Sequence, residues 1–109
     1  MESCLVLAVE ANGQKITTIE GIAKEGVLSP IRRKFIEHDA LQCGFCTPSF
    51  VLTAHYLLLV NPNPTESEIE EYLSGHIRRC GTYKQMIEAI LECAKKQNRA
   101  KASQRRDPC

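Results

Sequence analysis

The sequence predicts a mainly α-helical fold, a four-helix bundle preceded by a short β-hairpin. Three observations lead to this fold class. Four segments beyond residue 28 carry apolar residues at helical spacing, helix-start and helix-stop signals separate them, and Asn12-Gly13 lies between two runs of strand-forming residues. With 109 residues, the chain can bury one modest core but cannot hold two full-sized domains.

The hairpin is expected between Cys4 and Ile19. Leucine, valine, isoleucine and threonine dominate both halves of this segment, and Asn-Gly is a strong signal for a two-residue hairpin turn. An isolated hairpin is only marginally stable in water. This one therefore needs a partner, either in the rest of the chain or in a sheet that the chain does not contain.

Ser29 followed by Pro30 is typical of an N-cap and a first helical residue, so a first helix is expected from there to about Ala40. Its inner face is expected to carry Ile31, Phe35 and Ile36. Thr47-Pro48 repeats the start signal, and the residues up to Val60 are apolar on nearly all sides. Such a helix is typical of the buried centre of a small bundle.

Two more helices follow the break at Asn61-Pro62-Asn63-Pro64. Residues 65–68 form a capping box, which predicts a third helix that ends at Gly75. A fourth helix is expected to begin at Thr82 and to run through Ala94. The inward residues are expected to be Ile69, Tyr72 and Leu73 in the third helix and Met86, Ile87, Ile90 and Leu91 in the fourth.

Charge and hydropathy exclude several classes of protein. The formal net charge is +1, but residues 95–109 carry six basic side chains and one acidic one. This basic end lacks aromatic residues, so we expect a disordered, solvated tail and no nucleic acid partner. The longest apolar stretch, 50–60, is about half the length of a membrane span. No secretory signal is recognisable, and we therefore expect a cytoplasmic protein without disulfides.

Six cysteines in so short a chain need an explanation. Cys43-Gly44-Phe45-Cys46 is a C-x-x-C motif between the first two helices, and its glycine permits a tight turn that points sulfurs and backbone N–H groups toward a bound centre. By itself the motif fits a redox dithiol, a zinc site or an iron-sulfur cluster. Cys80 lies between the third and fourth helices, and an up-down bundle brings these two loops to the same end.

Three thiolates are one short of an all-cysteine cluster. His76, four residues before Cys80, is the nearest alternative ligand. Cys93 follows the apolar pattern of the last helix and is expected to be a small core residue, and Cys109 is expected to have no ligand role. His38 and His55 are expected to be structural.

The run Leu41-Gln42-Cys43-Gly44-Phe45-Cys46-Thr47-Pro48 resembles the L-Q-C-G-x-C-T-P-G signature of the small iron-sulfur subunits of molybdenum hydroxylases, the family of xanthine dehydrogenase and aerobic carbon monoxide dehydrogenase. The resemblance continues through 61–65, Leu73-Ser74-Gly75 and the Cys80 region with Tyr83. Ser3-Cys4-Leu5 and residues 17–21 look like the end of the family's ferredoxin domain and the start of its helical domain.

The resemblance implies a four-helix domain that holds one [2Fe-2S] cluster near a molybdopterin and passes electrons toward a flavin. Cys43, Cys46 and Cys80 are then cluster ligands, and Gln42 contacts the pterin cofactor. Cys4 matches the last ligand of a second cluster, whose other cysteines precede this chain. Residues 1–20 are accordingly expected to be a hairpin remnant of the ferredoxin-like domain, 21–96 the cluster-binding domain and 97–109 the tail.

Three departures from the family pattern bear on this interpretation. Arg78 stands where the family places the first cysteine of its C-x-C motif, and a guanidinium is a very poor iron ligand. Ser49 replaces a glycine, and Gly81-Thr82 inverts the usual Thr-Gly. The ferredoxin domain, which would relay electrons to the flavin, is absent from this sequence.

The leading hypothesis is a non-catalytic electron-transfer domain or subunit of a molybdenum hydroxylase. Its partners are expected to be a molybdopterin-binding large subunit and an FAD-binding subunit or domain. Two alternatives stay open: a structural zinc module built on Cys43, Cys46, His76 and Cys80, and a chain without metal. A thioredoxin-like enzyme is disfavoured because the C-x-x-C motif follows a helix and not a strand.

Overall fold

The structure, a computed structural model, describes residues 3–23, 26–77 and 79–103. It has four α-helices, which are α1 (Pro30–Glu37), α2 (Thr47–Val60), α3 (Glu66–Leu73) and α4 (Tyr83–Ser103). Short 3₁₀ turns at Ser3–Leu5, Ala8–Ala11 and Glu20–Ile22 precede them. The predicted four-helix domain is confirmed, and no helix among the described residues combines the length and apolarity that a membrane crossing requires.

The helices begin where the sequence places their start signals. Ser29 is the N-cap of α1 with a proline in the first turn. The Thr65 hydroxyl accepts the N–H of Glu68 while the Glu68 carboxylate accepts the N–H of Thr65, which forms the predicted capping box. At the start of α2 the N-cap is Cys46, one residue earlier than the Thr47 that the sequence suggests. These are local contacts, and so the sequence predicts them well.

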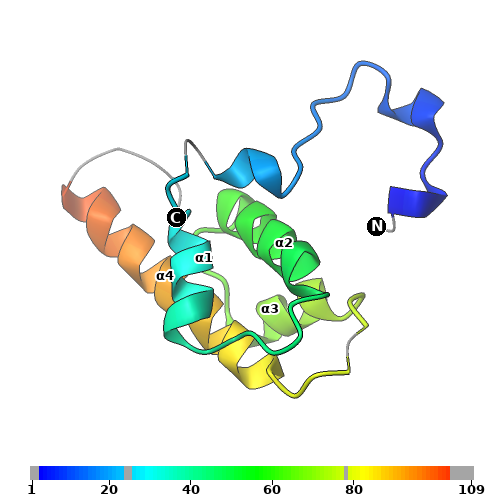
Figure 1. Ribbon diagram of the computed structural model, residues 1–109. Coiled ribbons are helices and arrows are strands. Elements are labelled where there is room, and N and C mark those ends of the chain that lie inside the picture. The colour runs from blue at the N-terminus through cyan, green and yellow to red at the C-terminus, as the bar shows by residue number, and fades with distance from the viewer. Residues whose placement is uncertain (1–2, 24–25, 78, 104–109) are drawn as a thin grey trace.

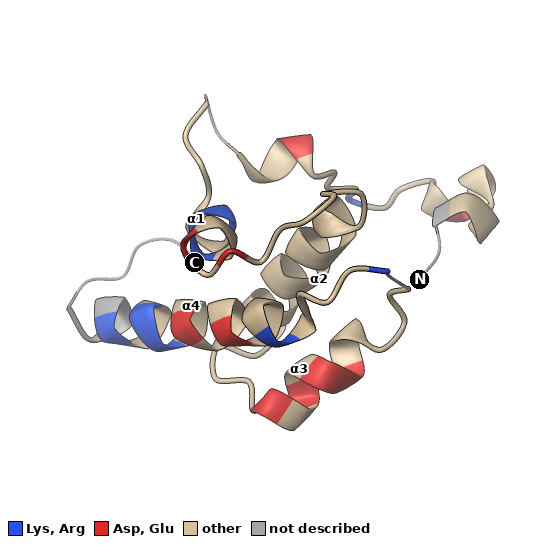
Figure 2. Cartoon of the chain, turned by 60° about the horizontal axis from the view of Figure 1, so that its bottom comes forward, with Lys and Arg blue, Asp and Glu red and all other residues tan. Residues whose placement is uncertain are grey.

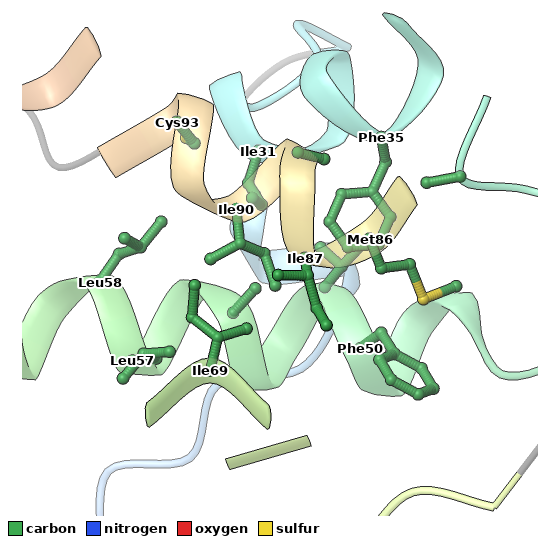
Figure 3. Close-up of a cluster of buried hydrophobic side chains, with 14 of the residues drawn as sticks. Ile31, Phe35, Phe50, Leu57, Leu58, Ile69, Met86, Ile87, Ile90 and Cys93 are labelled. Carbon is green, nitrogen blue, oxygen red and sulfur yellow. The ribbon is translucent and has the colours of Figure 1, made fainter. Parts of the chain in front are cut away.

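The core lies where α1, α2, α3 and α4 meet, and Figure 3 shows its side chains pointing toward one another. Both α1 and α3 pack against α2 and α4. The completely buried large side chains include Phe35 of α1, Phe50 of α2, Ile69 of α3 and Ile90 of α4. Cys93 is also fully buried, as the apolar pattern of the last helix predicts. It is disulfide-bonded, however, so the expectation of a chain without disulfides is wrong.

A charged cluster joins α1 to α4. The Lys34 side chain is buried, and its Nζ lies 2.7 Å from Glu92 Oε1 and also pairs with Glu37. His38 Nε2 binds the other oxygen of Glu92. Since Lys34 and Glu92 are 58 residues apart, this cluster ties the first helix to the last.

The predicted β-hairpin is wrong, because no β-strand forms within residues 3–23. The turn at Asn12-Gly13 exists, with the Gln14 N–H bonded to the Ala11 carbonyl at 3.1 Å. However, Asn12 has φ −63° and ψ 129° and Gly13 has φ 73°, the values of a type II turn. A two-residue hairpin needs a turn of type I′ or II′, whose twist matches that of the strands. The two flanking runs therefore do not pair: the residues before the turn form the 3₁₀ turn Ala8–Ala11, and residues 14–18 form no regular element. The N-terminal segment extends away from the bundle (Figure 1).

Three predictions about inward faces are also wrong. Ile36 and Tyr72 are exposed, because each adjoins in sequence a residue that points into the core, Phe35 or Leu73, and successive helical residues point about 100° apart. The outer side of α2 is uncovered as well, with Tyr56, Leu59 and Val60 exposed. Thus α2 is buried along one side and is not the fully enclosed centre of the bundle.

The last helix is longer than the sequence suggests. It continues to Ser103, so that helical structure extends into residues assigned above to a basic tail. Residues 104–109, Cys109 among them, lie outside the described residues. Figure 2 shows acidic residues gathered on α3 and basic residues on the later turns of α4.

Candidate metal centre

The loop between α1 and α2 carries the C-x-x-C motif. It begins where α1 ends, at Asp39, which has a left-handed φ of 49°, and Ala40, whose N–H bonds to the Phe35 carbonyl at 2.9 Å. Gly44 has φ +78°, a conformation that glycine adopts without steric cost. The predicted tight turn at this glycine is therefore present.

Cys80, from the loop between α3 and α4, reaches this motif. Its Sγ lies 3.5 Å from the Sγ of Cys43. The sequence predicts this approach from the up-down order of the helices, and the structure confirms that the two loops meet. Two thiolates bound to one tetrahedral ion at about 2.3 Å each are roughly 3.8 Å apart, so the spacing of this pair is close to that of a shared metal ion.

Cys46 does not join the pair. It is the N-cap residue of α2, and its half-buried side chain packs against the hydrophobic core. In the part of the chain that the structure describes, no group of three or more Cys, His, Asp or Glu side chains is arranged to hold a metal ion. The residues therefore fit a metal centre in part: one pair has the required spacing, and the third predicted ligand begins the adjoining helix.

His76 faces α2 and not the two cysteines in contact. Its Nε2 lies 3.0 Å from the Thr53 hydroxyl, and its ring centroid is 4.7 Å from that of Phe50. Burial lowers the pKa of His76, so the imidazole is mainly neutral near pH 7. Burial lowers the pKa of His55 in the same way. Sequence reasoning missed Thr53, and the only signal for it is its position one turn after Phe50 on α2.

The electrostatics of the site favour a thiolate at Cys43. The backbone N–H of Phe45 donates a hydrogen bond to its sulfur, the Cys80 thiol donates a second, and both lower the pKa of Cys43. The thiolate is the form of cysteine that binds metals and reacts as a nucleophile. Hydrogen-bond donors that point at a sulfur also tune iron-sulfur centres.

The surface beside the cysteines carries a feature that sequence reasoning missed. Phe45, in the C-x-x-C loop, is 94% exposed, and Ile77, in the loop of Cys80, is 95% exposed. Gln42 is exposed next to Cys43. The signal for this surface in the sequence is a bulky apolar residue in each loop, outside any helical pattern. Arg78 lies outside the described residues.

A four-helix domain in which Cys43 and Cys80 meet from two loops is the arrangement of a small cysteine-containing helical domain, and two of its thiols have the spacing of ligands to a shared metal ion. Residues 18–91 match the family described as [2Fe-2S] binding domain, and the chain belongs to this family. The family membership confirms the predicted cofactor, a [2Fe-2S] cluster, and it confirms the resemblance to iron-sulfur subunits of the xanthine dehydrogenase type.

Relatives and solved structures agree with the family. The chain is 46% identical to the nicotine 6-hydroxylase small subunit of Paenarthrobacter nicotinovorans, over 84% of this chain and 55% of that one. It is 39% identical to the xanthine dehydrogenase iron-sulfur-binding subunit of Escherichia coli O157:H7, over 87% of this chain and 61% of that one. The crystal structure of quinoline 2-oxidoreductase from Pseudomonas putida 86 superposes with a TM-score of 0.77 at 42% identity, covering 88% of this chain and 62% of that one. This chain thus spans a little more than half the length of the curated relatives it matches.

Proposed function

We propose that the chain is an electron-transfer domain of a molybdenum hydroxylase, in which a [2Fe-2S] cluster passes electrons from a molybdopterin centre toward a flavin. The observation that carries the proposal is the 3.5 Å approach of Cys43 and Cys80 from two loops, in a chain of the [2Fe-2S] binding domain family. When bound, the cluster supplies one-electron redox chemistry.

Within this proposal, Cys43, Cys46 and Cys80 hold the cluster. The Phe45 N–H donates to the Cys43 sulfur and so stabilises the thiolate form that ligation requires. Gly44 sets the turn that positions this N–H, since its φ of +78° is unfavourable for other residues. Cys46 must turn its side chain away from the core to bind, which its N-cap position permits, because the residue itself precedes the helix.

The partners are also proposals: a molybdopterin-binding large subunit and an FAD-binding subunit or domain. Phe45 and Ile77 support a protein partner at this site, because large apolar side chains are almost fully exposed in both cysteine loops. The exposed Gln42 side chain is free to contact a cofactor held by such a partner. The division into residues 1–20, 21–96 and 97–109 and a location in the cytoplasm remain predictions.

Anaerobic reconstitution with iron and sulfide tests the cluster. We expect a red-brown protein with visible absorption, iron and sulfide in equal amounts, and a paramagnetic signal after reduction. Cys43→Ser and Cys80→Ser should abolish it, whereas Cys4→Ser, an exposed cysteine in the N-terminal segment, should not. Arg78→Cys should increase iron retention, because it adds a thiolate at the position where the family places one. A colourless protein with stoichiometric zinc that is lost in His76→Ala would contradict the proposal and support the zinc module.

A further inference from the structure

The contact between Cys43 and Cys80 has a chemical use that needs no metal. Their sulfurs are 3.5 Å apart, and a disulfide bond is about 2.05 Å long, so bond formation requires an approach of about 1.5 Å. Both residues lie in loops between helices and not inside a helix. Cys43 is exposed and Cys80 is half-buried, so a small oxidant can reach the pair.

Cys46 is the cysteine that a C-x-x-C motif would ordinarily offer to Cys43. In the structure its side chain packs against the core at the start of α2. The neighbour that Cys43 contacts is instead Cys80, 37 residues further along the chain. Geometry and sequence thus predict different pairings for the same thiol.

We propose that Cys43 and Cys80 form a reversible disulfide when no cluster is bound, and that this disulfide closes the site to cluster assembly. One thiolate attacks a low-molecular-weight disulfide such as oxidised glutathione and forms a mixed disulfide, releasing one glutathione thiol. The second thiolate attacks the protein sulfur and releases the other glutathione thiol. Two protein thiols are oxidised, one glutathione disulfide is reduced to two thiols, and thiol reductants reverse the reaction.

The consequence for assembly follows from ligand chemistry. Iron binds cysteine as the thiolate, and the sulfurs of a disulfide are not thiolates, so they cannot bind iron in this way. The oxidised domain therefore lacks two of the three cysteines to which the proposed function assigns the cluster. This consequence depends on that proposed function, but the disulfide itself does not.

Peptide mapping of the full chain tests the pairing. The cluster-free protein is oxidised with glutathione disulfide, its free thiols are blocked with iodoacetamide, and the monomer is digested with trypsin without reduction. Cleavage after Lys34, Arg78, Arg79 and Lys84 gives peptide 35–78, which contains Cys43 and Cys46, and peptide 80–84, which contains Cys80. We expect the two peptides to be joined, and fragmentation of the joined species should place the bond at Cys43.

Matched variants make the assignment independent of fragmentation. Cys46→Ser should retain the linkage, whereas Cys43→Ser should abolish it, and Cys4→Ser should behave as the parent. An unlinked peptide 80–84, or a linkage that is lost in Cys46→Ser, would overturn the proposal.

Iron uptake measured before and after treatment with dithiothreitol tests the consequence. The cross-linked fraction should take up no iron until it is reduced, and uptake that is unaffected by cross-linking would overturn the blocking role. If the reduced protein also fails to bind a cluster, the proposed function fails while the mapped disulfide stands. The two failures are therefore distinguishable.

Discussion

Gly44 is the residue whose backbone the cysteine loop depends on most directly. No atom lies near the place where a Cβ would project, so size is not the constraint; the constraint is a φ of +78°. Placing an L-residue in this left-handed region costs roughly 1–2 kcal/mol. A substitution at Gly44 therefore measures the cost of backbone strain without a contribution from steric crowding.

We accordingly expect Gly44→Ala to lower the free energy of unfolding by about 1–2 kcal/mol in urea titrations followed by circular dichroism. Gly75→Ala is the matched control, because Gly75 also has open space around it but is not among the glycines with positive φ. The control should be neutral or slightly stabilising. Equal effects of the two substitutions would contradict the role of φ.

Glu92 is the second residue with a distinctive environment. Hydrogen bonds from Lys34 and His38 lower its pKa from 4.5 to about 2. A carboxyl whose pKa is lower in the folded state stabilises the fold at pH values above its unfolded pKa. That contribution is lost as the pH falls from about 4.5 toward 2.

Glu92→Gln should therefore reduce the acid dependence of the thermal midpoint in this window. Its midpoint should change less between pH 5 and pH 2.5, values chosen as roughly the limits of that window. Glu88→Gln is the control on the same helix, since Glu88 is exposed and makes no ion pair among the described residues. The explanation fails if the parent, the variant and the control show the same acid dependence.

At the scale of elements, α2 carries apolar side chains on two of its sides, but only one of these sides is buried. Leu57 is completely buried, whereas Leu59, two residues later, is 52% exposed. Truncating a buried leucine removes transfer free energy and leaves a cavity, at a cost of about 2–5 kcal/mol. Truncating an exposed one usually changes stability by about 0.5 kcal/mol or less.

Leu57→Ala and Leu59→Ala are thus a matched pair in composition and helix propensity. We expect the first to lower the free energy of unfolding by about 2–5 kcal/mol and the second to leave it nearly unchanged. Chemical denaturation of both variants under identical conditions measures the difference. A comparable loss in Leu59→Ala would mean that another part of the protein covers this side of α2.

Elements also show what the sequence could and could not predict. The capping box at Thr65 and Glu68 is a contact over three residues, so it could be read directly from the sequence. The hairpin could not, because Asn-Gly supports turns of opposite twist, and the φ of Asn12 decides between them. The meeting of Cys43 with Cys80 was predictable from helix order, whereas the packing of Cys46 on the core depends on a side-chain direction that its spacing does not encode.

At the scale of the whole molecule, the N-terminal segment contributes unequally to the fold. Leu5, Leu7, Val9 and Ile16 are 64–75% exposed. Ile19 and Ile22, in contrast, pack against the core, and Arg32 donates a hydrogen bond to the Ile19 carbonyl. The structural boundary of the helical unit therefore lies between residues 16 and 19.

Removing residues 1–14 should leave the thermal midpoint nearly unchanged, whereas removing residues 1–23 should lower it. The second deletion takes two apolar side chains from the core and a hydrogen-bond acceptor from Arg32. Calorimetry of the two shortened chains beside the parent measures the contrast. A large decrease in the thermal midpoint after removal of residues 1–14 would contradict this boundary, because it would show that Leu5, Leu7 and Val9 stabilise the fold.

The bond between Lys34 and Glu92 also bears on the order of folding. The connection between α2 and α3 is short, so their contact closes a small loop, whereas α1 can reach α4 only after a span of 58 residues has been brought together. Loop-closure entropy delays contacts between distant residues, and contacts of this kind slow folding. The α1–α4 pair that the buried lysine stabilises is therefore expected to dock after the α2–α3 pair. The contact between Cys43 and Cys80, 37 residues apart, likewise forms only when a long loop has closed.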